Sequence, residues 1–354
     1  MNCFYKYYKK ITLSLCFIYL SLLGNMVYIQ SHSNKINISD NMCSNSKSLI
    51  ESDIHIFNNY IDKYSKTYDL YSSEYWYRYN IYLLNKNYIN NFNSLNKSYK
   101  LGINKFADMS KLEFKKKYLG FNMKQEWISN YKVSNIKIPN SLDWRSMGAV
   151  TNIKDQKQCG SCWAFSAVGT IEGQHAIKTG HLVSLSEQNL VDCDNSSFGC
   201  EGGWPDKAIE YVINNSGIDT ELSYPYVAEQ QECSYSNNTI GATVSNVVRL
   251  PQADMNALYD ALGTVGPISV AIDAEDDFQL YSSGIYISSS CSTDSLDHAV
   301  LAVGYGISFN KKKYIIVKNS WGSDWGMNGY IYMSADIPNM CGIAENACYS
   351  NVTN

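Results

Sequence analysis

Eight cysteines between Cys159 and Cys348 constrain the fold of this 354-residue chain more than any other feature of its sequence. Whether they form disulfides depends on the compartment in which the chain folds, and the first residues indicate that compartment. Residues 1–31 carry three lysines, then the apolar stretch ITLSLCFIYLSLL, then small and polar residues. This layout is typical of a secretory signal peptide, and it predicts an oxidising compartment where disulfides are the usual use of cysteine.

The N-terminal segment has one alternative interpretation. Apolar residues continue thinly as far as Ile29, so an uncleaved signal anchor would also fit the sequence. Sites for N-glycosylation agree with export, although chance sites are frequent in a chain this rich in Asn. These sites are Asn37, Asn96, Asn195, Asn214, Asn237 and Asn351. We therefore expect a chain of the secretory pathway, with membrane attachment only if the segment remains as an anchor.

The chain divides into two parts of opposite charge. Residues 1–137 hold 19 Lys and Arg against 9 Asp and Glu (net +10), whereas residues 138–354 hold 10 against 24 (net −14), in agreement with the overall charge of −4. Such asymmetry can indicate a basic arm that binds nucleic acid. Here the lysines are interleaved with a regular apolar pattern, so we expect no nucleic-acid binding and electrostatic attraction between the two parts.

The first part of the chain predicts a mainly helical region. Residues 32–50 are polar and are expected to be irregular, whereas residues 51–95 have apolar side chains at helical spacing. One face of that helix carries Glu74, Arg78, Tyr82, Asn85, Ile89 and Asn93. The stretch Gly102–Asp108 alternates as one face of a short strand, and Ser110 and Glu113 predict a capping box for a further helix.

From Ile138 onward the pattern changes from helix to strand. Helices are expected at Ser161–Thr179, SEQNLVDC and WPDKAIEYVINN, with a short one near residues 253–262. Strands are expected at ATVSNVVRL, PISVAI, HAVLAVGYG, YIIVKNSW and GYIYMS. Helices followed by antiparallel strands predict an α+β fold of two packed subdomains with a cleft between them.

The stretch QCGSCWAFS places Cys159 and Cys162 three residues apart, and three kinds of chemistry could use them. A thioredoxin-like redox pair normally lies at a strand-to-helix junction of a βαβ unit, and no such unit flanks this stretch. A zinc site needs further ligands at suitable spacing, and no His stands near Cys193 or Cys200. A nucleophile needs a thiolate, a base and a group that orients the base.

The nucleophile interpretation has a candidate for each role. Cys162 lies at the predicted start of a helix, where free N–H groups and the helix dipole should lower its pKa. His298 opens a strand of the other subdomain and can face Cys162 across the cleft, whereas His175 and His181 lie too far along the Cys162 helix.

Three further residues can complete such a site. Asn319 can hydrogen-bond the far ring nitrogen of His298, and Trp321 can shield that bond from water. Gln156 can direct its side-chain amide at the oxygen of a tetrahedral intermediate, together with the backbone N–H of Cys162. A complete set of catalytic groups argues against a catalytically silent binding protein of the same fold.

These residues make the chain resemble papain-like cysteine protease precursors of the cathepsin L type. The resemblance covers about residues 51–350 and rests on QCGSCWAFS, GCEGG, LDHAVLAVGYG and VKNSWGSDWG, in that order. The first part of the chain also matches the propeptide of the family, through the spaced helical residues from Glu74 to Asn93 and a complete Gly-x-Asn-x-Phe-x-Asp motif. Tyr82 stands where the family pattern has Phe.

The resemblance implies both an organisation and an activity. It implies an inhibitory prodomain at 51–110, a propeptide linker at 111–137 and a two-subdomain catalytic domain at 138–354, which follow the signal peptide or anchor indicated at residues 1–31. The chain would be a cysteine endopeptidase zymogen that hydrolyses proteins through a thioester acyl-enzyme, with no cofactor or metal, and loses its prodomain at acid pH. Its partners would be protein and peptide substrates, its own prodomain and cystatin-like inhibitors, in a lysosome, another acidic vacuole or the extracellular space.

The resemblance also assigns roles to individual residues. Disulfides would join Cys159 to Cys200, Cys193 to Cys233 and Cys291 to Cys341, which leaves Cys43 and Cys348 without a family partner. Gly202 and Gly203 match the backbone strip that pairs with an extended substrate. The other substrate-binding residues implied are Trp204, Pro205, Ala271, Ala299, Trp321 and Asn346.

Two consequences of these assignments can be tested. Mostly apolar walls favour Leu, Phe or Val as the second side chain upstream of the cut, and Asn346 places a polar amide at the floor of that pocket. Lys157 stands where the family usually has Gly after the oxyanion Gln, so it could strain that loop or add charge at the rim of the cleft.

Overall fold

The structure is a computed structural model that describes residues 38–121, 126–134 and 136–353. The chain divides into two compact units, residues 1–58 and 59–354. The predicted signal segment lies outside the described residues, as does Asn37. No helix within the described ranges has both the length and the apolar character that a membrane crossing requires.

Two helices occupy the region where one long helix was expected. Helix α2 spans Ile38–Lys63, so the prediction of an irregular segment was wrong for residues 38–50. Helix α3 spans Ser73–Ser94, and the chain between the two is not helical. The break has a local cause, because Ser65 and Tyr71 adopt positive φ and the Ser72 side chain caps α3 by accepting from the N–H of Tyr75.

Within the stretch Gly102–Asp108, residues 102–104 have no regular secondary structure and residues 105–108 form a turn, so the prediction of a strand there was wrong. Strand β1 (Tyr99–Leu101) ends before it, and helix α4 (Lys111–Tyr118) follows with the expected capping box. The side-chain oxygen of Asn104 accepts from the N–H of Phe106 at 2.9 Å, and this local bond favours a turn over a strand. The alternation of residue types in Gly102–Asp108 therefore does not indicate a strand.

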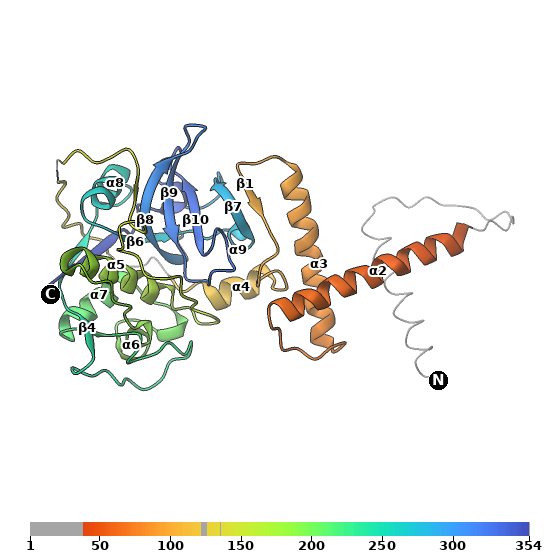
Figure 1. Cartoon of the computed structure of the whole chain (residues 1–354), viewed down its shortest axis with the longest axis horizontal. Helices are drawn as coiled ribbons and strands as arrows, with labels where there is room; N and C mark the ends of the chain where they lie inside the picture. The colour runs from red at the N-terminus through yellow and green to blue at the C-terminus, as the bar shows by residue number, and fades with distance from the viewer. Residues whose placement is uncertain (1–37, 122–125, 135, 354) are drawn as a thin grey trace. The chain divides into compact units, whose positions relative to one another are not determined.

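A helical subdomain follows in the sequence. Strand β2 (Leu142–Asp143) precedes helix α5 (Cys162–Thr179), helix α6 (Glu187–Cys193), the 3-10 helix η1 (Gly199–Glu201) and helix α7 (Pro205–Asn214). Helix α5 is buried along most of its length and ends at Gly180, whose φ of 77° suits glycine. Figure 1 shows α5, α6 and α7 gathered on one side of strands β8–β10.

The second subdomain is built on a long sheet. Its elements are β3 (Ile218–Asp219), β4 (Ile240–Ala242), β5 (Val244–Arg249), α8 (Met255–Thr264), β6 (Ile268–Ile272), α9 (Asp276–Gln279), β7 (Tyr281–Tyr286), β8 (His298–Ile307), β9 (Lys313–Lys318), β10 (Tyr330–Ser334), η2 (Met340–Gly342) and β11 (Cys348–Val352). The sheet order is β1-β7-β10-β9-β8-β6-β11-β5, with β2 paired to β8, and strands β3 and β4 pair separately. The described pairs are antiparallel except β7 with β10. Because β1 pairs with β7, the N-terminal region contributes a strand to this sheet (Figure 1).

The cysteines follow the pairing implied by the resemblance. Within the described residues, disulfides join Cys159 to Cys200, Cys193 to Cys233 and Cys291 to Cys341. Cys162 and Cys348 are free and buried. The described residues contain no group of three or more His, Cys, Asp or Glu side chains placed to hold a metal ion.

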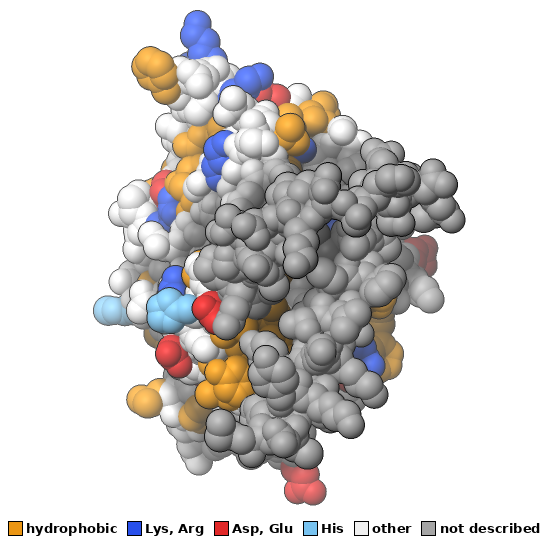
Figure 2. All heavy atoms as spheres, turned by 90° about the vertical axis from the view of Figure 1, so that its right-hand side faces the viewer, with side chains coloured by type: hydrophobic (Ala, Val, Ile, Leu, Met, Phe, Trp, Pro, Cys, Tyr) orange, Lys and Arg blue, Asp and Glu red, His pale blue; other side chains and the backbone are white. Residues whose placement is uncertain are grey.

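Figure 2 shows Lys and Arg side chains interspersed with hydrophobic and uncharged ones on one face of the molecule.

Candidate active site

Cys162 is the first residue of α5 and is completely buried. Burial raises the pKa of its thiol to about 11, although backbone N–H groups of Ala299, Gly120 and Trp163 hydrogen-bond the sulfur and oppose that rise. The expectation of a lowered pKa was therefore wrong for this state of the molecule. The helix terminus is present as predicted, but removing the sulfur from water outweighs its effect.

His298 and Asn319 form the hydrogen bond that the sequence suggested. The Nε2 atom of His298 lies 2.9 Å from Oδ1 of Asn319, and this oxygen also accepts from the N–H of Ser320 at 2.8 Å. Because an oxygen at that position needs donors, the proton of the neutral ring is assigned to Nε2. The other ring nitrogen, Nδ1, is buried and has no partner among the described residues, so its lone pair is available to accept a proton.

The surroundings of His298 favour its neutral form. Burial lowers the pKa of His298 to about 4, against the hydrogen bond with Asn319, which raises it. The ring of Trp321 stacks on the imidazole, with centroids 4.6 Å apart and planes inclined by 23°. A neutral thiol and a neutral imidazole are thus the favoured states here, and neither is the reactive form of a thiolate–imidazolium pair.

Gln156 is held with its amide oriented in one direction. Its Oε1 accepts from the hydroxyl of Ser320 at 2.6 Å, and its Nε2 donates to the carbonyls of Tyr118 at 3.0 Å and Cys159 at 2.8 Å. The amide donor predicted for an oxyanion therefore meets a carbonyl oxygen of the N-terminal region.

Residues 118–121, which we call the strap, pass directly over Cys162. The carbonyl of Gly120 accepts from the N–H of Gly203 at 2.9 Å, and the N–H of Phe121 donates to the carbonyl of Asp297 at 3.1 Å. A Cβ on Gly202 would lie 2.7 Å from the Gly120 carbonyl oxygen, so only glycine allows this close approach. The backbone strip predicted to bind substrate is occupied by the strap.

The predicted pocket residues lie around the strap in two adjoining groups. Phe121 packs in one apolar cluster with Cys162, Leu296 and three predicted residues, Ala271, Ala299 and Trp204. A neighbouring cavity is lined by Phe121, Trp127, Trp204, Pro205, Asp206, Asn346 and Cys348. The side-chain oxygen of Asn346 is buried without a partner among the described residues, which agrees with a polar floor. Trp321, in contrast, lies against His298 and does not line this cavity.

Aromatic side chains of the N-terminal region cover the outer side of Trp321. Phe114 meets the indole edge-on at a centroid distance of 4.9 Å, and Phe106 does so at 5.8 Å. Polar contacts join the same two regions, since Lys105 lies 2.5 Å from a carboxylate oxygen of Asp155 and the hydroxyl of Tyr99 donates to Asp277 at 2.7 Å.

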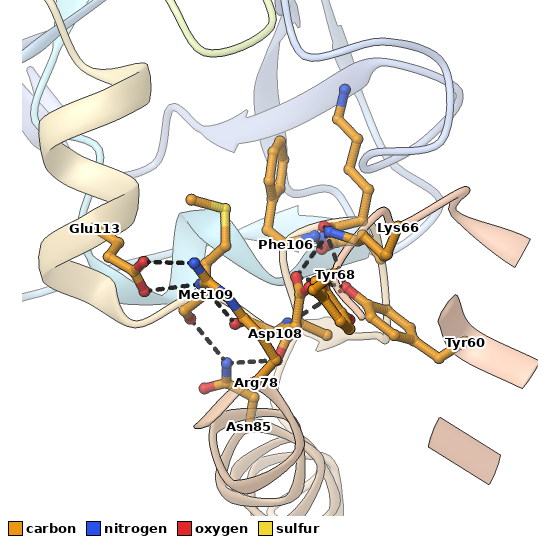
Figure 3. Close-up of polar contacts among 12 residues, drawn as sticks. Tyr60, Lys66, Tyr68, Arg78, Asn85, Phe106, Asp108, Met109 and Glu113 are labelled. Carbon is orange, nitrogen blue, oxygen red and sulfur yellow. Dashed lines mark hydrogen bonds and ion pairs between the residues drawn. The ribbon is translucent and has the colours of Figure 1, made fainter. Parts of the chain in front are cut away.

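Asp108 is a buried carboxylate that holds the N-terminal region together (Figure 3). Its Oδ1 accepts from the hydroxyl of Tyr60 and from Nζ of Lys66, both at 2.8 Å, and its Oδ2 accepts from the hydroxyl of Tyr68 at 3.2 Å. Nearby, Arg78 pairs with Glu113 at 2.9 Å, besides the predicted pair with Glu74. Because Arg78 of α3 also donates to the backbone carbonyl of Asp108 at 3.2 Å, this turn is tied to α2, to the chain after α2 and to α3.

Sequence reasoning missed two residues of the site. Ser320 fixes the orientation of both Gln156 and Asn319, and its position directly after Asn319 was the available signal. Asp297 supplies a backbone carbonyl to the strap, and nothing in its side-chain type could indicate a role of its main chain.

Lys157, where the family pattern has Gly, adopts a backbone conformation that favours glycine. Its φ is 51°, in the left-handed region, and its N–H donates to Oδ1 of Asp155 at 2.9 Å. A side chain in that region costs about 1 kcal/mol. The strain expected in this loop is therefore present.

Comparison with known proteins accounts for both regions of the chain. Residues 138–351 match the family model described as "Papain family cysteine protease", and residues 57–114 match the "Cathepsin propeptide inhibitor domain (I29)". The cathepsin L-like peptidase of Aedes aegypti is 48% identical over 264 residues, which cover 71% of this chain and 78% of the relative. Digestive cysteine proteinase 1 of Homarus americanus is 51% identical over 258 residues, covering 71% and 80%.

A solved structure extends the comparison to the whole arrangement. The structure of digestive procathepsin L2 proteinase from the larval midgut of Tenebrio molitor superposes with a TM-score of 0.79 at 38% identity. The match covers 84% of this chain and 99% of that one.

Proposed function

The chain belongs to the papain family of cysteine proteases, and on that basis we propose that Cys162 is its nucleophile and His298 its general base. It is a cathepsin L-like cysteine endopeptidase made as a zymogen, with its own propeptide domain as intramolecular inhibitor. The observation that supports the residue assignment best is the strap, which crosses Cys162 and engages the groups that substrate would need. We place the processing site near Ile138, where the match to the protease family begins.

In the proposed mechanism Nδ1 of His298 takes the thiol proton of Cys162. The thiolate attacks the carbonyl carbon of the scissile bond, and the amide of Gln156 and the N–H of Cys162 stabilise the resulting oxyanion. The imidazolium donates its proton to the leaving amine, and a thioester forms. A water molecule, deprotonated by His298, then attacks the thioester and releases the acid product and the thiol. Asn319 keeps the ring in place throughout, through Nε2.

The strap explains why this machinery is inactive in the zymogen. It occupies the amide donor of Gln156, the N–H of Gly203 and the carbonyl of Asp297. It also buries the sulfur, so that the thiol stays protonated. Removing the strap would free these groups and rehydrate the site together.

The pocket suggests a substrate preference, and the family suggests inhibitors and a cellular location. We propose that Leu, Phe or Val fits beside Ala271 and Ala299, with Asn346 adjusting tolerance for polar side chains. We also propose inhibition by cystatin-like proteins, and a location in a lysosome, another acidic vacuole or the extracellular space.

Replacing Cys162 by Ala or Ser tests the assignment. The variant should fold, with its three disulfides intact, and should show no more than trace cleavage of a fluorogenic Phe- or Leu-containing peptide after processing by added wild-type enzyme. The matched control is Cys348→Ser, which alters the other free buried cysteine and should leave turnover measurable. Substantial turnover by the Cys162 variant would show that the nucleophile lies elsewhere.

A further inference from the structure

Residues 126–134, which we call the linker segment, bind a second surface beyond the strap. The segment lies along β5, which ends the order of strands in the described sheet. The N–H of Asn130 donates to the carbonyl of Arg249 at 3.2 Å, the N–H of Arg249 donates to Oδ1 of Asn130 at 2.7 Å, and Nδ2 of Asn130 donates to the carbonyl of Val247 at 3.0 Å. One asparagine thus satisfies three backbone groups of the sheet edge.

Residues before Asn130 extend the same contact. The indole N–H of Trp127 donates to the carbonyl of Leu250 at 2.8 Å, and its ring lies 5.8 Å from the guanidinium of Arg249. The hydroxyl of Ser129 donates to the carbonyl of Arg249 at 2.9 Å. The guanidinium itself is fixed from behind by Asp206 of α7, at 2.6 Å.

Asp260 of α8 receives the other end of the linker segment. Its Oδ2 accepts from the hydroxyl of Tyr131 at 2.6 Å and from the N–H of Ser134 at 2.7 Å, and its Oδ1 accepts from the hydroxyl of Ser134 at 2.5 Å. Among the described residues, these are the hydrogen bonds that its carboxylate makes. Asp260 is only 8% exposed, so the segment covers a built recognition site.

Processing near Ile138 would remove the linker segment and open this surface. The backbone groups of Val247 and Arg249 and the carboxylate of Asp260 would then lose their partners. Open strand edges accept extended chains in either direction, because the main-chain groups repeat along the edge. The surface is also continuous with the substrate pocket, since Trp127 lines the same cavity as Phe121 and Asn346.

We infer that the edge of β5 and Asp260 form an exosite that binds an extended segment of a protein substrate, upstream of the pocket. A fitting segment carries an asparagine flanked by aromatic and hydroxyl side chains, since these are the groups that the surface now satisfies. Phe121 and Asn130 are nine residues apart, so the substrate must extend about ten residues before the pocket. The inference rests on the proposed function, because it takes the pocket as the substrate site.

Kinetics on the processed enzyme test this inference. Two long quenched peptides share one cleavage site. One carries the residues of Trp127–Ser134 in reverse order about ten residues upstream, so that its Trp lies nearest the pocket as Trp127 does, and the other carries the same residues scrambled. We expect a KM about tenfold lower for the matched peptide, because hydrogen bonds to one charged group can strengthen binding by about that factor. Asp260→Asn should remove that advantage and leave cleavage of a dipeptide substrate unchanged. The matched control is Asp336→Asn, whose carboxylate pairs with Lys312 of the β8–β9 hairpin.

A binding measurement separates the exosite from catalysis. Processed enzyme with its active-site thiol alkylated should bind a labelled peptide of residues 126–134 and bind the scrambled peptide more weakly. Equal KM values for the two long peptides would overturn the inference, and so would an advantage that survives in Asp260→Asn. Binding of the peptide without any kinetic advantage would also overturn it, because the surface would then anchor only the propeptide. Failure of the proposed function would show differently, as dipeptide cleavage that persists in the Cys162→Ala variant, with peptide binding unaffected.

Discussion

At the scale of single residues, the sequence sufficed to propose the roles of the site residues but not their protonation states. The order and spacing of Gln156, Cys162, His298 and Asn319 predict a protease site, and the structure brings Asn319 to His298. Their pKa values depend on burial, which follows from the strap as well as from the residues themselves. Ser320 was missed because its role lies in fixing two neighbouring amides.

His298 and Asn319 should differ in their contribution to turnover. His298→Ala should lower kcat/KM by about 10³-fold or more, because the proton acceptor is lost, whereas Asn319→Ala should lower it by about 10–100-fold, because the ring is only less well oriented. Steady-state kinetics of the processed variants measures both. Exposed His181 provides the control, since His181→Ala should leave kcat/KM unchanged. A larger loss of kcat/KM in Asn319→Ala than in His298→Ala would contradict the roles proposed for the two residues.

At the scale of elements, several helix ends were predicted from local signals, but the break before α3, which Ser72 caps, and several short strands were not. The capping box at Ser110 and the end of α5 at Gly180 are local signals, so the sequence alone indicates them. Strands β1, β7 and β11 were missed because each is stabilised by partners far along the chain. The turn before Asp108 was taken for a strand, because alternation cannot distinguish a sheet from consecutive turns.

Removing the charge of Asp108 should loosen the propeptide domain. Asp108→Asn leaves Lys66 without a carboxylate partner in a buried setting and should cost about 2 kcal/mol or more of the stability of that domain. Thermal unfolding of the zymogen on the Cys162→Ala background measures the loss, and processing of the active zymogen at pH 7 should accelerate. Asp69→Asn, at an exposed position of the same region, should change neither. Unaltered unfolding of Asp108→Asn would mean that the hydrogen bonds in Figure 3 contribute little.

At the scale of the whole molecule, the division of charge predicted attraction between propeptide and catalytic domain. The structure shows where some of that attraction acts, as in the pair between Lys105 and Asp155. Composition could not identify these partners, because pairing across the interface depends on how the two regions dock. Composition also could not predict that the linker segment binds along β5, since that contact depends on β5 being an open edge of the sheet.

Acid should weaken the zymogen through groups with shifted pKa values. With the strap in place, burial holds the pKa of His298 at about 4, so the imidazole resists a proton that it would accept once the strap is released. The strap-bound state therefore loses stability relative to the released state as pH falls from about 6.5 to 4. Burial opposes ionisation of Glu113, but hydrogen bonds from Ser110 and Arg78 hold its pKa below the usual range. Burial likewise opposes ionisation of Asp260, but hydrogen bonds from Ser134 and Tyr131 hold its pKa below the usual range. The contacts of both carboxylates are therefore lost in acid. Burial raises the pKa of Asp297 to about 7, and this group acts in the opposite direction.

Self-processing should therefore be slow at pH 7 and fast near pH 4–5. High salt should accelerate it at neutral pH, because salt screens surface attraction over about 10 Å at 0.1 M. Time courses on gels at both pH values, with and without salt, measure these rates. Rates that respond to neither variable would leave the charge division without a regulatory role.

The most direct measurement is to map where an epoxide inhibitor that traps thiols reacts, in the zymogen at pH 7 and in the acid-processed enzyme. With Cys162 as the nucleophile and the strap as its cover, the processed enzyme should carry one adduct, on Cys162, and the zymogen should react far more slowly. Peptide mass spectrometry identifies the modified residue in each sample. An adduct on Cys159 or Cys348, or equal reaction of zymogen and processed enzyme at Cys162, would contradict this mechanism.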